Sequence, residues 1–114
     1  MKIISAKLHG IIDYLVVVFL LVSPTIFGFT DLLAGFTYAL GGIHLILTLL
    51  TDFNAGLFKV IPLPLHGLIE LVVGIVLVVL AYTVFNDTEA GMLFYTSFGA
   101  AVVLVWFLTD YKSV

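Results

Sequence analysis

The sequence predicts an all-α integral membrane protein with four transmembrane helices, arranged as two tandem helical hairpins. Of its 114 residues, 63% are hydrophobic and 10% are charged, whereas soluble domains carry about 25% charged residues. Four apolar stretches are close to the roughly 20 residues that a helix needs to cross a bilayer. These are residues 4–27, 32–51, 63–85 and 91–109. They lack the apolar and polar alternation of barrel strands, so helices are expected.

A tandem duplication predicts the hairpin arrangement. The stretch from Leu8 to Asp13 reads LHGIID and recurs from Leu65 to Glu70 as LHGLIE, while the closing triplet Thr-Asp-Phe at 51–53 recurs as Thr-Asp-Tyr at 109–111. We therefore expect one membrane domain built of repeat 1, about residues 4–53, and repeat 2, about residues 63–111. Because each repeat has an even number of spans, both enter from the same side, which predicts a pseudo-two-fold axis along the membrane normal.

Each predicted helix has a recognisable beginning or end. The first follows Lys2 and Lys7 but is too long for a signal peptide and lacks a small-residue cleavage site, so it is expected to remain as a span. Pro24 should bend or end this helix near its outer end. The short connections at residues 28–31 and 86–90 can only join antiparallel neighbours, and two prolines, at 62 and 64, suit the approach to the third helix.

The lysines predict the orientation of the helices. All four, at positions 2, 7, 59 and 112, fall on the side shared by both termini and the middle loop. By the positive-inside rule, the termini and the loop at residues 54–64 are expected to be cytoplasmic. Trp106, Tyr111, Phe27 and Phe29 are expected to be interfacial anchors at the helix ends.

At the outer end of the first helix, the sequence contains Ser23-Pro24-Thr25. With its paired hydrophobic helices, the chain resembles the SPW repeat family, membrane proteins made of two-helix repeats with Ser-Pro-Trp in the first helix. Thr25 replaces the tryptophan, and the second repeat has Leu80-Ala81-Tyr82 at the corresponding place. The resemblance implies the fold and a bacterial inner-membrane setting, and it implies no particular activity.

Ionisable residues within the predicted helices gather near the cytoplasmic side. His9 and Asp13 form an i, i+4 pair on one helix, as do His66 and Glu70 on another. Charged groups in a bilayer cost free energy, about 2.5 to 3.5 kcal/mol for an aspartate at a helix centre, so these side chains should face inward and find partners. Imidazole nitrogens and carboxylate oxygens on adjacent helices could bind zinc, iron or manganese, which makes these four residues a candidate metal site.

A structural interpretation competes with the metal site. Asp52 and Asp110 lie at helix C-termini, where the helix dipole disfavours negative charge, so each is expected to pair with His66 or His9 and tie the helix ends together. His44 has no counterpart in repeat 2, since Val102 occupies the matching position. It could be a haem ligand together with His9 and His66, a protonation switch, or a hydrogen-bond donor to a neighbouring helix.

Three functions remain open from the sequence alone: a bundle that binds a metal or haem, an oligomeric proton or ion conduit, and a structural membrane protein without a ligand. The absence of cysteine excludes disulfides and thiolate metal sites. No spacing matches a catalytic signature, so an enzyme is the less favoured class, and without a basic patch no nucleic-acid partner is expected. Small residues at Gly35 and Ala39, and at Ser97 and Ala101, would permit a homo-oligomer within the lipid bilayer.

Overall fold

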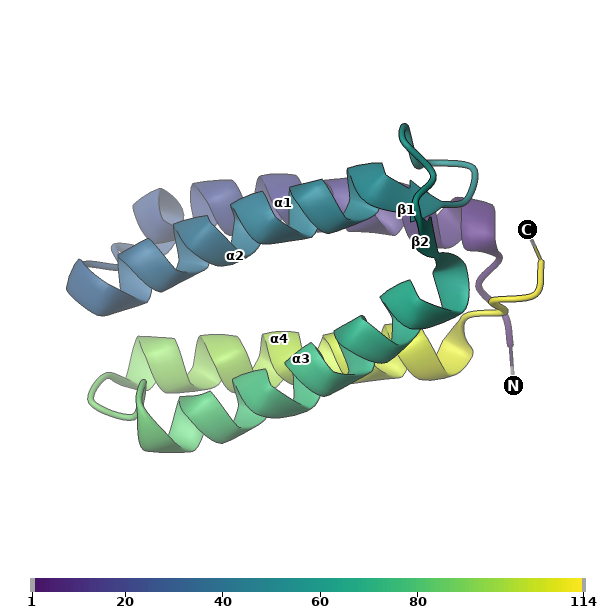
Figure 1. The fold of residues 1–114 in the computed structure, drawn as a ribbon. Helices are drawn as coiled ribbons and strands as arrows, with labels where there is room; N and C mark the ends of the chain where they lie inside the picture. Colours follow the sequence, from purple (N-terminus) through teal and green to yellow (C-terminus); the bar gives the residue numbers. More distant parts are fainter. Residues whose placement is uncertain (1, 114) are drawn as a thin grey trace.

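The computed structural model describes residues 2–113 and consists of four long helices (Figure 1). The helices are α1 (Ala6–Phe27), α2 (Asp31–Leu50), α3 (Leu63–Thr83) and α4 (Glu89–Leu108). Two short strands, β1 (Thr51–Asp52) and β2 (Ile61–Pro62), lie between α2 and α3. The predicted all-helical class and the four predicted helices are confirmed, with bounds that differ from the apolar stretches by at most two residues.

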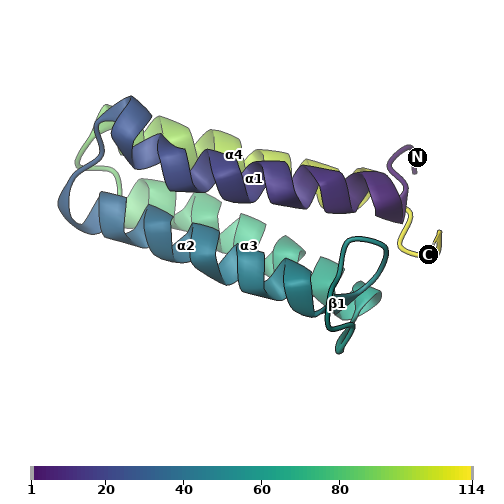
Figure 2. The same ribbon diagram turned by 90° about the horizontal axis from the view of Figure 1, so that it is seen from above.

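The helices form two layers. Helix α1 packs against α2 and α3 against α4, while α1 lies over α4 and α2 over α3 (Figures 1 and 2). Aromatic rings join the layers: the ring centroids of Phe19 and Phe94 are 5.6 Å apart, and those of Phe36 and Phe85 are 5.1 Å apart. Ring pairs at such distances add to the free energy gained from burial.

Local sequence sets the ends of the helices. The Ser5 side chain accepts a hydrogen bond from the Leu8 N–H and caps α1, and Thr88 caps α4 in the same way with the Gly91 N–H. Gly28 ends α1 with a φ of 68°, a left-handed conformation that glycine adopts without a steric penalty. Pro24 lies inside α1, one turn before its end.

Two parallel pairings hold the segment that follows one helix beside the segment that precedes another helix. In β1 and β2, Thr51 pairs with Ile61 in parallel, and an isolated bridge pairs Thr109 with Ile4 in the same sense. Each of these threonines ends a helix, and each partner precedes a helix that carries a buried histidine. The pairings therefore fix the position of each helix end relative to a histidine, which the hydrophobic pattern alone does not predict.

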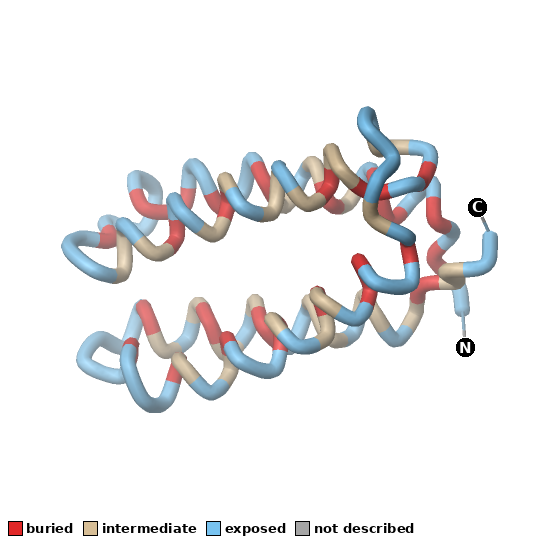
Figure 3. Tube along the Cα trace, in the orientation of Figure 1, coloured by how far each residue is buried: buried red, intermediate tan, exposed pale blue. Residues whose placement is uncertain are grey.

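The outer surface of the four helices is apolar. Buried residues follow the sides of the helices that face one another, and exposed residues cover the rest (Figure 3). Many of the exposed residues are large hydrophobics, including Leu15, Ile43, Val79 and Leu104. All four helices are long and apolar enough to cross a membrane.

One polar contact joins α2 to α4 away from the termini. The Tyr95 hydroxyl lies 2.6 Å from Thr37 Oγ1, and both residues are fully buried. Thr37 Oγ1 is also 2.8 Å from the Leu33 carbonyl, to which it donates its own proton. The tyrosine is therefore the donor in the contact between the two hydroxyls.

This donor assignment predicts unequal effects of two similar substitutions. Tyr95→Phe should lower the free energy of unfolding by about 0.5 to 1.5 kcal/mol, since Thr37 keeps its bond to Leu33. Thr37→Val should cost more, about 1 to 3 kcal/mol, because it leaves the buried Tyr95 hydroxyl without an acceptor. Reversible unfolding in mixed micelles measures both values, and the opposite ranking would contradict the assignment.

Candidate functional site

Two histidines and two carboxylates meet between α1 and α3. Each of His9, Asp13, His66 and Glu70 offers one ligand atom, and these four atoms lie within 4.8 Å of one another. His9 Nε2 is 2.8 Å from Glu70 Oε1 and 3.2 Å from Asp13 Oδ1, while His66 Nε2 is 3.1 Å from both Asp13 Oδ2 and Glu70 Oε1. All four side chains are buried. We call this group the His/carboxylate cluster.

A threonine hydroxyl orients each imidazole ring. Thr109 Oγ1 lies 2.8 Å from His9 Nδ1, and Thr51 Oγ1 lies 2.7 Å from His66 Nδ1. Each hydroxyl donates its own proton to the helix carbonyl four residues earlier, at 2.6 Å in both cases. Since a hydroxyl has only one proton, it must accept from Nδ1, so both rings carry a proton on Nδ1 and point Nε2 at the carboxylates.

The cluster requires protons or a metal ion between its acceptor atoms. With Nδ1 protonated, a neutral imidazole presents a lone pair on Nε2, and a carboxylate presents only lone pairs. Four acceptor atoms at these distances repel one another unless protons or a metal ion lie between them. Protons would give two imidazolium–carboxylate pairs, whereas a metal ion would give two nitrogen and two oxygen ligands.

His44 lies beside the cluster on α2. Its Nε2 is 3.4 Å from Asp13 Oδ1, longer than a good hydrogen bond, and has no hydrogen-bond partner among the described residues 2–113. The structure thus brings all three predicted histidines to Asp13, but only His9 and His66 contact both carboxylates.

Two aromatic rings cover the histidine side of the cluster. The Phe53 ring lies 5.6 Å from the His66 ring, and the Tyr111 ring lies 5.7 Å from the His9 ring. The glycine after each histidine makes room for an aromatic ring of its own repeat: a Cβ on Gly67 would be 2.7 Å from Tyr111, and one on Gly10 would be 3.2 Å from Phe53 and closer still to Ala55. The repeated His-Gly pair is thereby explained by close packing.

Tyr111, which the sequence predicts to be an interfacial anchor, packs over the His9 ring. Burial raises the pKa of the Tyr111 phenol, and the negative charge of Glu70 raises it further. Tyr111 is therefore protonated at neutral pH.

The pairing predicted for Asp52 and Asp110 is corrected. The threonine before each aspartate, rather than the aspartate itself, bonds to the histidine ring. Asp52 is exposed, and Asp110 Oδ1 accepts a hydrogen bond from the Lys112 N–H. A hydroxyl fits this buried position because it satisfies both the imidazole and a helix carbonyl and brings no charge.

Sequence reasoning missed Thr51, Thr109 and the two covering rings as parts of the site. The repeated Thr-Asp-aromatic triplet does mark these positions. However, a triplet in sequence does not reveal which of its three residues faces a histidine some distance away. The strand pairings set the direction of the chain after each helix, and this direction determines which residue of the triplet faces the histidine.

No family model, no curated protein and no solved structure matches this chain. The resemblance to the SPW repeat family rests on Ser23-Pro24 and the paired apolar helices. Inference about function therefore starts from the His/carboxylate cluster itself.

The glycine packing predicts opposite effects of adding one methyl group at two places. Gly67→Ala should lower the free energy of unfolding by about 1 to 3 kcal/mol, because the new Cβ overlaps the Tyr111 ring. Gly42→Ala, where nothing lies within 4 Å, should raise it by about 0.5 to 1 kcal/mol through helix propensity. Unfolding in mixed micelles measures both.

A double variant tests the cause. In a Tyr111→Ala background, Gly67→Ala should lose most of its cost, since the overlapping ring is gone. An undiminished cost in that background would mean that Tyr111 is not what Gly67 accommodates.

Proposed function

We propose that the chain is an integral membrane protein of two hairpins, related by a pseudo-two-fold axis along the membrane normal, that binds a divalent metal ion. The ligands are His9, Asp13, His66 and Glu70. The observation that carries the proposal is the convergence of four ligand atoms within 4.8 Å, with both Nε2 atoms directed at the carboxylates.

The surface and the charge distribution support membrane insertion and the orientation. Large hydrophobic side chains are exposed along all four helices, far more than a soluble monomer presents. The lysines lie at the end that holds both termini and the strands, whereas Asp31, Asp87 and Glu89 lie at the other end (Figure 1). This asymmetry supports cytoplasmic termini, and the SPW resemblance supports a bacterial inner membrane.

Contacts between equivalent residues support the two-fold relation. His9 contacts His66, and each histidine bonds to the threonine that closes the other repeat. Farther along the bundle, Thr37 meets Tyr95, which occupies the matching position of repeat 2. Pairs of equivalent residues contact each other where a two-fold axis passes between them, so an axis along the bundle accounts for these contacts.

The ligand set suits a divalent ion. Imidazole nitrogen and carboxylate oxygen are ligands for zinc, iron and manganese, and zinc binds both at about 2.0 to 2.2 Å. In a tetrahedral site such bonds place neighbouring ligand atoms about 3.3 to 3.6 Å apart. The nitrogen to oxygen distances of 2.8 to 3.2 Å are shorter, so the side chains would move apart by a few tenths of an ångström to admit the ion.

The orientation of the rings also favours a metal, and the charge balance permits one just as it permits two imidazolium–carboxylate pairs. Histidine ligands in metal sites usually donate the other ring N–H to a fixed acceptor, as His9 and His66 do to the threonines. Two carboxylates, two neutral imidazoles and one divalent ion sum to zero charge. A neutral cluster suits apolar surroundings, where an unpaired charge is costly.

Haem and ion conduction are less well supported. The His9 and His66 rings are 5.6 Å apart at 77°, and both Nε2 atoms face the same carboxylates, so no planar slot separates them for a macrocycle. For conduction, the polar groups should continue along the bundle. The cavity next to the cluster is instead mostly apolar.

Threonine substitutions test the metal site. The purified protein should bind one Zn²⁺ per chain by calorimetry and elemental analysis, and the His9→Ala/His66→Ala variant should bind none. Thr51→Val should weaken Zn²⁺ binding by about 10-fold to 100-fold, because His66 loses the group that orients it.

The matched control is Thr48→Val. Thr48 lies on α2, is also buried and also donates to the carbonyl four residues earlier, that of His44, but within residues 2–113 it forms no hydrogen bond to the cluster. Zn²⁺ affinity should be unchanged in this variant. Failure to bind Zn²⁺, or equal losses in both threonine variants, would leave two imidazolium–carboxylate pairs as a purely structural clamp.

The topology has its own test. A single cysteine introduced at Lys59 or at Asp87 would be the sole thiol in the protein, because the chain has no natural cysteine. In intact cells a membrane-impermeant maleimide should label Asp87→Cys and leave Lys59→Cys unlabelled until the membrane is permeabilised. Labelling of both from outside would contradict the four-span topology.

A further inference from the structure

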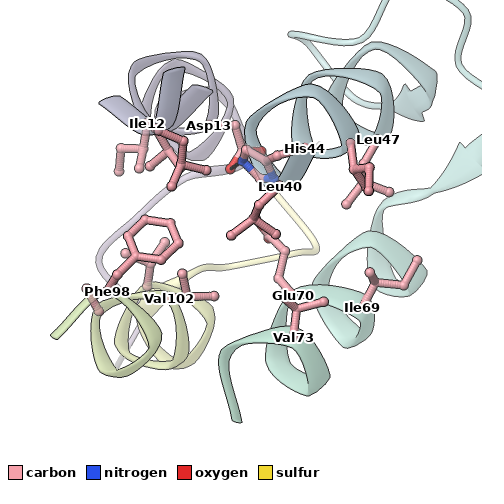
Figure 4. A pocket seen from close by; sticks show the side chains of 15 residues that line it. Ile12, Asp13, Leu40, His44, Leu47, Ile69, Glu70, Val73, Phe98 and Val102 are labelled. Carbon is pink, nitrogen blue, oxygen red and sulfur yellow. Dashed lines mark ion pairs between the residues drawn. The ribbon is translucent and has the colours of Figure 1, made fainter. Parts of the chain in front are cut away.

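A cavity of about 120 Å³ lies between the two layers, next to the His/carboxylate cluster (Figure 4). Side chains from all four helices line it, and most are apolar, such as Leu40, Val73 and Phe98. Three polar side chains also line it: Asp13, His44 and Glu70. The cavity therefore has an apolar body with one polar end.

The polar end is the carboxylate side of the cluster. His9 and His66 are absent from the lining, since they lie on the opposite side under Phe53 and Tyr111. From Asp13 the lining continues along α1 to Leu20, about 10 Å farther at 1.5 Å per residue. The cavity thus runs from the carboxylates toward the middle of the helices.

The polar end contains a complementary donor and acceptor. Within residues 2–113, His44 Nε2 has no hydrogen-bond partner, and Asp13 Oδ2 meets only His66 Nε2, at 3.1 Å and outside good hydrogen-bond geometry. The Asp13 side chain is only 3% exposed, so water does not readily satisfy it. Buried polar groups without good hydrogen bonds are costly, so a ligand that bonded to both would gain free energy.

A hydroxyl group matches this pair. It donates one hydrogen bond, which a carboxylate accepts, and it accepts another, which the Nε2–H tautomer of His44 donates. A charged ligand would not match, because the lining beyond Asp13, His44 and Glu70 is apolar. A pure hydrocarbon would leave both polar groups unsatisfied.

The volume limits the size of the ligand. An apolar cavity of roughly 150 Å³ holds one benzene molecule, which has six carbon atoms. By proportion, the cavity of about 120 Å³ holds a molecule of about five non-hydrogen atoms.

We propose that this cavity binds small uncharged aliphatic alcohols, with the alkyl chain among the apolar side chains and the hydroxyl between Asp13 and His44. The site shares Asp13 and Glu70 with the metal site but does not require the metal. Alcohols of this size dissolve in bilayers and can reach a cavity between helices from the hydrocarbon region.

The test uses 1-butanol and its isomer methyl propyl ether, which has the same five non-hydrogen atoms but no hydroxyl. The protein is placed in lipid nanodiscs, both after chelation and loaded with Zn²⁺, and the ¹⁵N resonances of the histidine side chains are followed. In both states butanol should shift the His44 signal saturably. The ether should bind about threefold to tenfold more weakly, which corresponds to one lost hydrogen bond.

Two pairs of variants locate the site. Val102→Phe fills the cavity and should abolish saturable binding, whereas Leu104→Phe, on the exposed side of α4, should leave it unchanged. In His44→Leu, where binding is followed through the His9 and His66 resonances, butanol should bind about threefold to tenfold more weakly and ether binding should be unchanged.

Purely linear partitioning of butanol, equal affinity for butanol and ether, or unchanged binding in Val102→Phe would each overturn the proposal. These outcomes are independent of Zn²⁺ binding in the same samples. The chelated protein tests the alcohol site even where the metal site fails, and the Zn²⁺ titration tests the metal site even where no alcohol binds.

Discussion

The burial of two imidazoles and two carboxylates in one place is the constraint on which the rest of this structure depends. Ionisable groups removed from water must have partners for nearly every polar atom, or the fold loses several kcal/mol. Nδ1 of each histidine is satisfied by a threonine hydroxyl, and that hydroxyl is itself satisfied by a helix carbonyl. The position where α2 and α4 end follows from this requirement, because each must present a threonine in its last turn or just after it.

The same constraint accounts for the glycines, the aromatic rings and the strands. Parallel pairing of Thr51 with Ile61, and of Thr109 with Ile4, holds each threonine beside the segment that leads into a histidine helix. The chain beyond each threonine then lays Phe53 or Tyr111 over a histidine ring, and a glycine after each histidine admits the aromatic ring. The histidine side of the cluster is thereby closed, and access remains from the apolar cavity on the carboxylate side.

Neither repeat holds a complete site. Each histidine takes its threonine and its covering ring from the opposite repeat, and each carboxylate contacts a histidine of the opposite repeat. The stretches most alike between the repeats are those that build the cluster. His44 and Val102 occupy matching positions in the two repeats, and both line the cavity. The cavity therefore has a polar side chain on the α2 side where it has an apolar one on the α4 side.

The sequence by itself determined the helical class, the four helices to within two residues and the residues of the cluster. Composition predicts the helical class and the four helices, because near-continuous apolar runs of about 20 residues form helices. The i, i+4 spacing predicts the cluster residues, because it puts each histidine and its carboxylate on one helical face. Only the tertiary structure decided that Thr51 and Thr109, rather than Asp52 and Asp110, hold the histidines. It also decided that His44 adjoins Asp13 without a hydrogen bond and that a cavity lies beside the carboxylates. These features depend on how the chain turns after each helix and how the two layers meet, and residues 15 to 100 positions apart in the sequence contain no local signal of their distance in space.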